Sequence, residues 1–60
     1  MIGARLELAR EATGLSLREL VAAMDRPVSA TAISKYERNE MQPSAGILAS
    51  LARALQVPLA

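Results

Sequence analysis

Residues 15–39, LSLRELVAAMDRPVSATAISKYERN, decide the fold because they hold the start signals of two short helices joined by a proline-containing connection. The first start is a capping box, in which the Ser16 side chain caps the helix and Glu19 returns to the Ser16 amide. We therefore predict a helix over about residues 17–24. Pro27 lacks an amide proton and pushes the residue before it out of helical geometry, so the helix ends before it.

The second helix of the pair starts at another serine. Ser29 is placed to cap a helix over residues 30 to about 38, in which Ile33 and Tyr36 face inward. Asn39 follows, and asparagine is the commonest residue other than glycine at the left-handed position that ends a helix. We therefore expect this helix to end at Asn39.

A further helix is expected before this pair. Residues 2–13 are rich in Ala, Leu, Glu and Arg, which favour helices, and Gly14 suits the left-handed position after the last turn. The residues expected on one face of this helix are Ile2, Leu6, Ala9 and Thr13.

Another helix is expected after the pair, with Ser44 as its cap and Gln56-Val57-Pro58 as its end. Its apolar stripe comprises Ile47, Leu48, Leu51, Ala52 and Leu55. A fifth segment begins at residues 57–60, and no strand-like alternation occurs anywhere in the sequence. The sequence therefore predicts an all-α fold, a compact bundle of four to five short helices.

Composition excludes several classes of protein. The 60 residues contain no Cys and no His, which rules out disulfides, zinc fingers and histidine-based catalysis, and no histidine is present to activate the serines. We therefore predict no enzymatic activity, no metal and no cofactor. The uncharged stretch at residues 41–52 is too short for a bilayer, and the N-terminus lacks the features of a signal peptide, so we expect a cytoplasmic protein. The net charge of +1 does not by itself indicate a nucleic-acid partner.

The outward face of the helix after Ser29 offers a binding surface. Its first residues are small, and Lys35 and Arg38 lie three apart further along. In a helix-turn-helix unit such a helix enters the DNA major groove. Periodicity and charge alone leave open a second interpretation, an ordinary solvated face, because most amphipathic helices have one.

The sequence resembles the phage-repressor/Cro-type (XRE) helix-turn-helix family over nearly its whole length. The family pattern runs G-L-S-Q-x-E-L-A, then V-S-x-x-x-I-S-x-x-E-x-G, then a proline and L-x-x-L-A-x-x-L-x-V. Residues 15–20 and 28–39 match the first two parts, and the last part is matched by Pro43, Leu48, Leu51, Ala52, Leu55 and Val57. The resemblance implies a lambda-repressor-like DNA-binding domain.

The resemblance also implies roles for individual residues. Base-reading side chains fall at Ala30, Thr31 and Lys35. Contacts with the DNA backbone are expected from Ser16, Leu17, Arg18, Ser29, Ser34, Arg38 and Asn39. The family often pairs the glutamate at position 37 with a basic residue of the first helix, so Arg10 and Glu37 are expected to form a structural ion pair. The implied partner is double-stranded DNA, bound by a homodimer on a palindromic operator of a regulated gene, so the protein would be associated with the nucleoid.

Three positions depart from the family pattern. Leu17 replaces a glutamine that commonly touches the DNA backbone, so it would contact a thymine methyl or a sugar instead, or simply be tolerated. The connection that contains Asp25-Arg26-Pro27 is longer than in the simplest members, and Arg26 could reach a phosphate from it. Asn39 stands where glycine is usual, at little cost because asparagine tolerates the left-handed conformation.

We interpret residues 1–60 as a single helix-turn-helix domain, with the unit itself at about residues 16–39, and expect it to be the N-terminal part of a longer regulator. The alternative is a helical protein-interaction module that has lost DNA binding, such as an antitoxin-like or regulatory partner domain. Leu8, Val21 and Leu59 would supply the apolar contacts of such a module.

Overall fold

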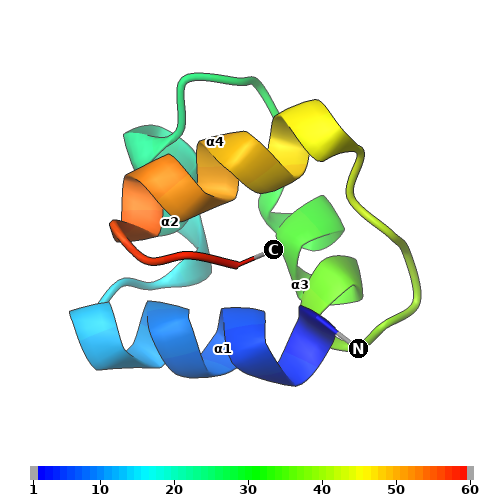
Figure 1. Ribbon diagram of the computed structural model, residues 1–60, viewed down its shortest axis with the longest axis horizontal. Helices are drawn as coiled ribbons and strands as arrows, with labels where there is room; N and C mark the ends of the chain where they lie inside the picture. Colours follow the sequence, from blue (N-terminus) through cyan, green and yellow to red (C-terminus); the bar gives the residue numbers. More distant parts are fainter. Residues whose placement is uncertain (1, 60) are drawn as a thin grey trace.

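The computed structural model describes residues 2–59, which form four helices and no strand. The helices are α1 (Ile2–Thr13), α2 (Leu17–Ala23), α3 (Ala30–Glu37) and α4 (Ala45–Leu55). In Figure 1, α1 and α4 lie on opposite sides of the molecule, and the segment after α4 folds back between them. The all-α prediction is confirmed. None of the described helices is long and apolar enough to cross a bilayer.

The three predicted serine caps are all present. Ser16 and Glu19 form both halves of the capping box, with N···O distances of 3.1 Å from the Glu19 amide to Ser16 Oγ and 2.8 Å from the Ser16 amide to Glu19 Oε1. The hydrogen bond from the Ser16 amide lowers the pKa of Glu19 below its ordinary value. Ser29 and Ser44 each accept a hydrogen bond from the amide three residues on, and so fix the starts of α3 and α4.

The helix ends agree with the sequence to within a residue or so. Gly14 and Asn39 adopt the predicted left-handed conformation, with φ of 75° and 60°. Gln56 also does so after α4, with φ of 57°, which the sequence did not indicate. Met24 is extended and so ends α2 one residue earlier than predicted. Arg38 caps the end of α3 instead of continuing it.

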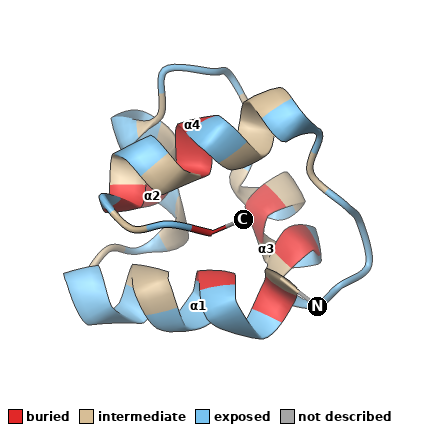
Figure 2. Ribbon diagram, viewed as in Figure 1, coloured by how far each residue is buried: buried red, intermediate tan, exposed pale blue. Residues whose placement is uncertain are grey.

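Each helix contributes to one core. Its buried side chains are Leu6, Leu20, Ile33, Tyr36, Leu51, Leu55 and Leu59. Figure 2 shows the buried residues on the sides of the helices that face the interior, and exposed residues on the outer side of α1. The segment after α4 forms no fifth helix in the described residues, and Ala60 lies outside them.

Two expectations about individual residues were wrong. Leu59 is buried and belongs to the core, because the chain folds back after α4, so it is not a free apolar side chain on the surface. Thr13 is exposed, since it lies in the last turn of α1, where its hydroxyl donates to the Arg10 carbonyl oxygen at 2.8 Å.

The start of α1 approaches the end of α3 closely at a glycine. The Gly3 amide donates to Asn39 Oδ1 at 3.1 Å. A Cβ atom at Gly3 would overlap the Glu37 carbonyl oxygen and lie 2.7 Å from Asn39 Oδ1. Because a backbone carbonyl cannot move aside without moving its helix, only glycine permits this contact.

We predict that Gly3→Ala lowers the free energy of unfolding by about 1–3 kcal/mol, because the added methyl group forces α1 away from α3. The matched control is Gly46→Ala in the first turn of α4, where the new methyl group meets only the end of the exposed Arg26 side chain. That change should be neutral or stabilising by up to about 1 kcal/mol, since alanine favours helix over glycine. Urea unfolding of both variants measures the difference, and equal losses would contradict the close approach at Gly3.

Candidate nucleic-acid interface

The outer face of α3 carries the residues predicted to read bases. Thr31 and Lys35 are exposed and lie four residues apart, on one side of the helix, while Ala30 is partly buried. Ile33 and Tyr36 anchor the opposite side in the core. The helix therefore presents one small polar side chain and one flexible cation to solvent near its two ends.

Arg38 and Ser34 extend this face toward the end of α3. Arg38 Nη1 donates to Ser34 Oγ at 2.9 Å, so the two predicted backbone contacts lie side by side. The same guanidinium pairs with Glu40 through two N···O contacts of 3.0 and 3.2 Å. Both charged side chains are more than half exposed, so the pair is weak and a phosphate can replace the carboxylate. Glu40 was not predicted from the sequence as a partner of Arg38.

The serine caps remain able to donate a hydrogen bond. Ser16 Oγ and Ser29 Oγ each accept from their own helix, and each hydroxyl keeps its hydrogen for an acceptor outside the protein. Both residues are exposed. At the start of α2, the Glu19 carboxylate accepts a hydrogen bond from the Ser16 amide. It also places a negative charge where a phosphate would approach.

The remaining predicted backbone contacts differ in their surroundings. Arg18 is exposed on α2. Leu17 is partly buried against the core, which gives it a structural role whether or not it touches DNA. Asn39 is exposed, but its side-chain oxygen holds the Gly3 amide and so ties α3 to α1.

The predicted partners Arg10 and Glu37 lie in contact between α1 and α3. Arg10 Nε and Nη2 donate to the Glu37 carboxylate at 2.6 and 3.2 Å, and Arg10 Nη1 donates to the Leu15 carbonyl oxygen at 2.9 Å. The side chains are only 15% and 6% exposed. The hydrogen bond with Glu37 raises the pKa of Arg10 above its ordinary value. The guanidinium thus joins α1, α3 and the turn before α2.

The connection between α2 and α3 is tied to α4, which sequence reasoning missed. Asp25 accepts hydrogen bonds from Ser50 and Arg53 of α4, and Arg26 lies against Gly46. Arg26 is exposed, as its expected phosphate contact requires. A polar Ser50 inside the apolar stripe of α4 was the one available signal, but its partner is 25 residues away in the chain.

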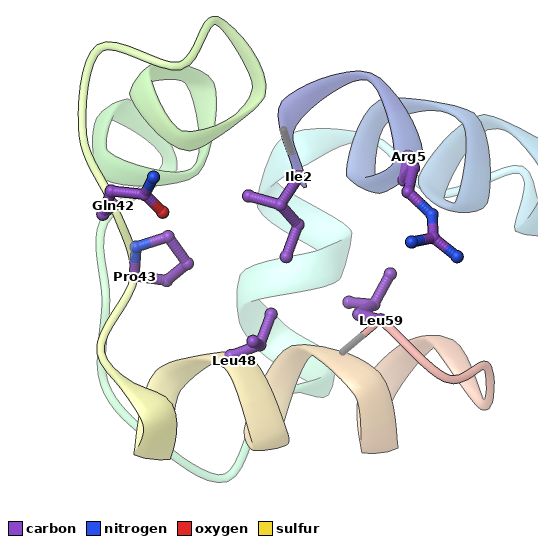
Figure 3. Close-up of a pocket in the computed structure, with 6 residues that line it drawn as sticks. All are labelled: Ile2, Arg5, Gln42, Pro43, Leu48 and Leu59. Atoms are coloured by element: carbon purple, nitrogen blue, oxygen red, sulfur yellow. The ribbon is translucent and has the colours of Figure 1, made fainter.

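Two hollows lie away from the predicted DNA-binding residues. The first, of about 360 Å³, opens between the start of α1, the loop after α3, α4 and the C-terminal segment (Figure 3). It is lined by Ile2, Arg5, Gln42, Pro43, Leu48 and Leu59. The second, of about 320 Å³, shares Leu48 and Leu59 with it and is almost wholly apolar. No residue assigned to base reading or to the DNA backbone lines either hollow.

Comparison with protein families bears directly on this arrangement. The family described as helix-turn-helix, which is of the XRE type, matches residues 6–60. The chain belongs to this family. Comparisons with curated proteins and with solved structures gave no significant match.

Membership makes this a DNA-binding helix-turn-helix regulator domain, from a family that binds DNA and does not act as an enzyme. Its helix-turn-helix unit consists of α2, the connection and α3. The resemblance found in the sequence is thereby confirmed at the level of the family.

We predict that Glu37→Gln lowers the free energy of unfolding of the helix-turn-helix domain by about 3 kcal/mol, because it leaves the Arg10 charge shielded from water without a counter-charge. The matched control is Glu40→Gln, the same substitution in the exposed pair with Arg38, which should change stability by less than about 0.5 kcal/mol. Chemical denaturation measures both. Equal losses of unfolding free energy in the two variants would show that the buried pair stabilises the domain no more than the exposed pair does.

A second prediction concerns DNA affinity. Glu40→Gln should tighten non-specific duplex binding several-fold, because phosphate no longer competes with a carboxylate for Arg38. The slope of log affinity against log salt should steepen by up to about 0.9, the value for one additional phosphate contact. Fluorescence anisotropy at several salt concentrations measures both quantities. In an Arg38→Gln background most of the effect should vanish, and its persistence would mean that Glu40 acts only through overall charge.

Proposed function

We propose that this helix-turn-helix domain binds double-stranded DNA sequence-specifically, with α3 in the major groove, and that it does so as a homodimer on a palindromic operator. The observation that carries the proposal is that α3 is fixed on its inner side while its outer side stays free. Arg10 and Glu37 hold the helix to α1, and Thr31 and Lys35 remain exposed. A helix that is positioned before binding loses little freedom when it enters the groove.

Each part of the outer face has a role in this mechanism. Lys35 donates to guanine O6 or N7, and Thr31 contacts the neighbouring base edge. Ala30, at the first position of α3, meets a thymine methyl group. Arg38 and Arg18 contact phosphates and set the register without reading sequence.

Further phosphate contacts come from the ends of the helices. The hydroxyls of Ser16, Ser29 and Ser34 donate to phosphate oxygens. At the other end of α3 from Ser29, the Asn39 side-chain amide nitrogen donates to a further phosphate while its oxygen accepts from the Gly3 amide. Leu17 contributes a sugar contact at the edge of its packing against the core. These groups hold the helix-turn-helix unit on the duplex while α3 reads the bases.

The number of cations supports binding as a dimer. The chain has seven Lys and Arg residues against six acidic ones, so a single copy holds few phosphates. The domain measures 22 × 21 × 20 Å across its Cα atoms. Half-sites one helical turn apart are separated by about 34 Å, which two adjacent copies can span.

Selection from randomised duplexes tests this proposal. We expect enrichment of one motif, in the form of an inverted repeat if the dimer is correct. The double variant Thr31→Ala/Lys35→Ala should lower affinity for that motif by roughly 10- to 100-fold, in keeping with the loss of a base contact. The matched control is Thr13→Ala/Arg5→Ala, which likewise removes one threonine hydroxyl and one positive charge, but from exposed positions of α1. It should lower affinity only slightly.

The competing function is a protein-interaction module. It is favoured by Leu8, which is 68% exposed, and by the apolar hollow beside Leu48 and Leu59. Absence of any enriched motif at low salt, where attraction to phosphate is strongest, would overturn the DNA-reading proposal in favour of this one. Enrichment of a single half-site would keep the reading mechanism and reject the dimer.

A further inference from the structure

Ser50 is the most deeply buried polar residue among those described, with 1% of its surface exposed. It lies on α4 among the apolar residues of the core. A buried hydroxyl without a partner is costly, and Ser50 Oγ meets this cost by donating to Asp25 Oδ1 at 2.5 Å. The partner of the buried Ser50 hydroxyl therefore lies not on α4 but in the connection between α2 and α3.

Arg53, three residues further along α4, completes the contact. Its Nη2 atom lies 3.1 and 2.9 Å from the two Asp25 carboxylate oxygens. The hydrogen bonds from Ser50 and then Arg53 lower the pKa of Asp25 below its ordinary value. We call these three residues the Asp25 cluster; it holds a carboxylate that stays ionised at neutral pH.

A neighbouring contact extends the cluster along α4. The Arg26 guanidinium lies so close to Gly46 that a Cβ atom there would come within 2.7 Å of Arg26 Nη1. Gly46, Ser50 and Arg53 follow one another at helical spacing and so lie on one side of α4. This side of α4 thus receives two successive residues of the connection.

The two ends of α3 are held differently. Its C-terminal end is fixed to α1 directly, by the Arg10–Glu37 pair and by the hydrogen bond from Gly3 to Asn39. Its N-terminal end, where Ala30 and Thr31 lie, follows immediately after the connection. Among the described residues, the Asp25 cluster is the polar contact that joins this connection to α4. The Asp25 and Arg53 side chains are 61% and 60% exposed, so their ion pair is weak, and the buried Ser50 hydroxyl is the member that holds Asp25 in place.

We infer that Asp25 and Ser50 are positioning residues for base reading, which set the N-terminal end of α3 against the groove by fixing the connection to α4. This inference rests on the proposed function. Base contacts require accurate placement of donors and acceptors, whereas attraction to phosphates falls off slowly with distance. Loosening the connection therefore weakens specific binding more than non-specific binding.

The test is Ser50→Ala, which removes the hydroxyl without changing charge. The ratio of non-specific to specific Kd should fall about tenfold, while non-specific affinity and its salt dependence remain those of the unchanged protein. The matched control is Ser44→Ala, the same substitution at the cap of the same helix, which does not touch Asp25. It should leave the ratio unchanged. Both variants are compared at a temperature where unfolding curves show each to be folded.

A second variant separates geometry from charge. Asp25→Asn keeps a side-chain oxygen that accepts from Ser50. The ratio of non-specific to specific Kd should therefore fall less in Asp25→Asn than in Asp25→Ala. The inference is overturned if Ser50→Ala and Ser44→Ala change the ratio equally, or if Ser50→Ala weakens both affinities in parallel. Failure of the proposed function looks different, because the unchanged protein would then select no motif at all.

Discussion

The ion pair between Arg10 and Glu37 is the interaction on which the rest of the domain depends. It joins the first and third helices, and its third hydrogen bond reaches the turn at Leu15 from which α2 starts. Because both side chains are largely removed from water, neither charge is satisfied without the other. The pair thus sets the relative placement of three helices whose apolar contacts alone would tolerate some sliding.

The hydrophobic core stabilises the fold but does little to fix how the helices are placed relative to one another. It is built almost entirely from leucine and isoleucine, with Tyr36 as its one aromatic side chain. Aliphatic side chains of similar size can exchange places at modest cost, so such a core does not by itself fix one arrangement. The polar contacts at Glu37, Asn39 and Asp25 supply this specificity, and they surround α3 at its end and at the connection that precedes it.

Local features could be predicted from the sequence, and contacts between distant residues largely could not. Helix starts at Ser16, Ser29 and Ser44 depend on residues three apart, so they are visible in the chain itself. The contact of Asp25 with Ser50 joins residues 25 apart and depends on the angle at which α4 crosses the connection. The Arg10–Glu37 pair was anticipated only because the family pattern carried it. The burial of Leu59 required knowing that the chain folds back, which the left-handed Gln56 brings about and no local pattern announced.

The charged side chains that hold the helices together differ in exposure from those expected to face DNA, and this difference has a practical consequence. The Arg10 and Glu37 charges, which hold α1 to α3, are largely buried, so dissolved ions reach them poorly. Lys35 and Arg38 are exposed to water and are screened within about 10 Å at moderate salt. Ionic strength therefore acts on the DNA-binding face and the scaffold separately. Concentrated salt should release the domain from a duplex while it remains folded. Bound nucleic acid can therefore be removed during purification by raising the salt concentration of the buffer.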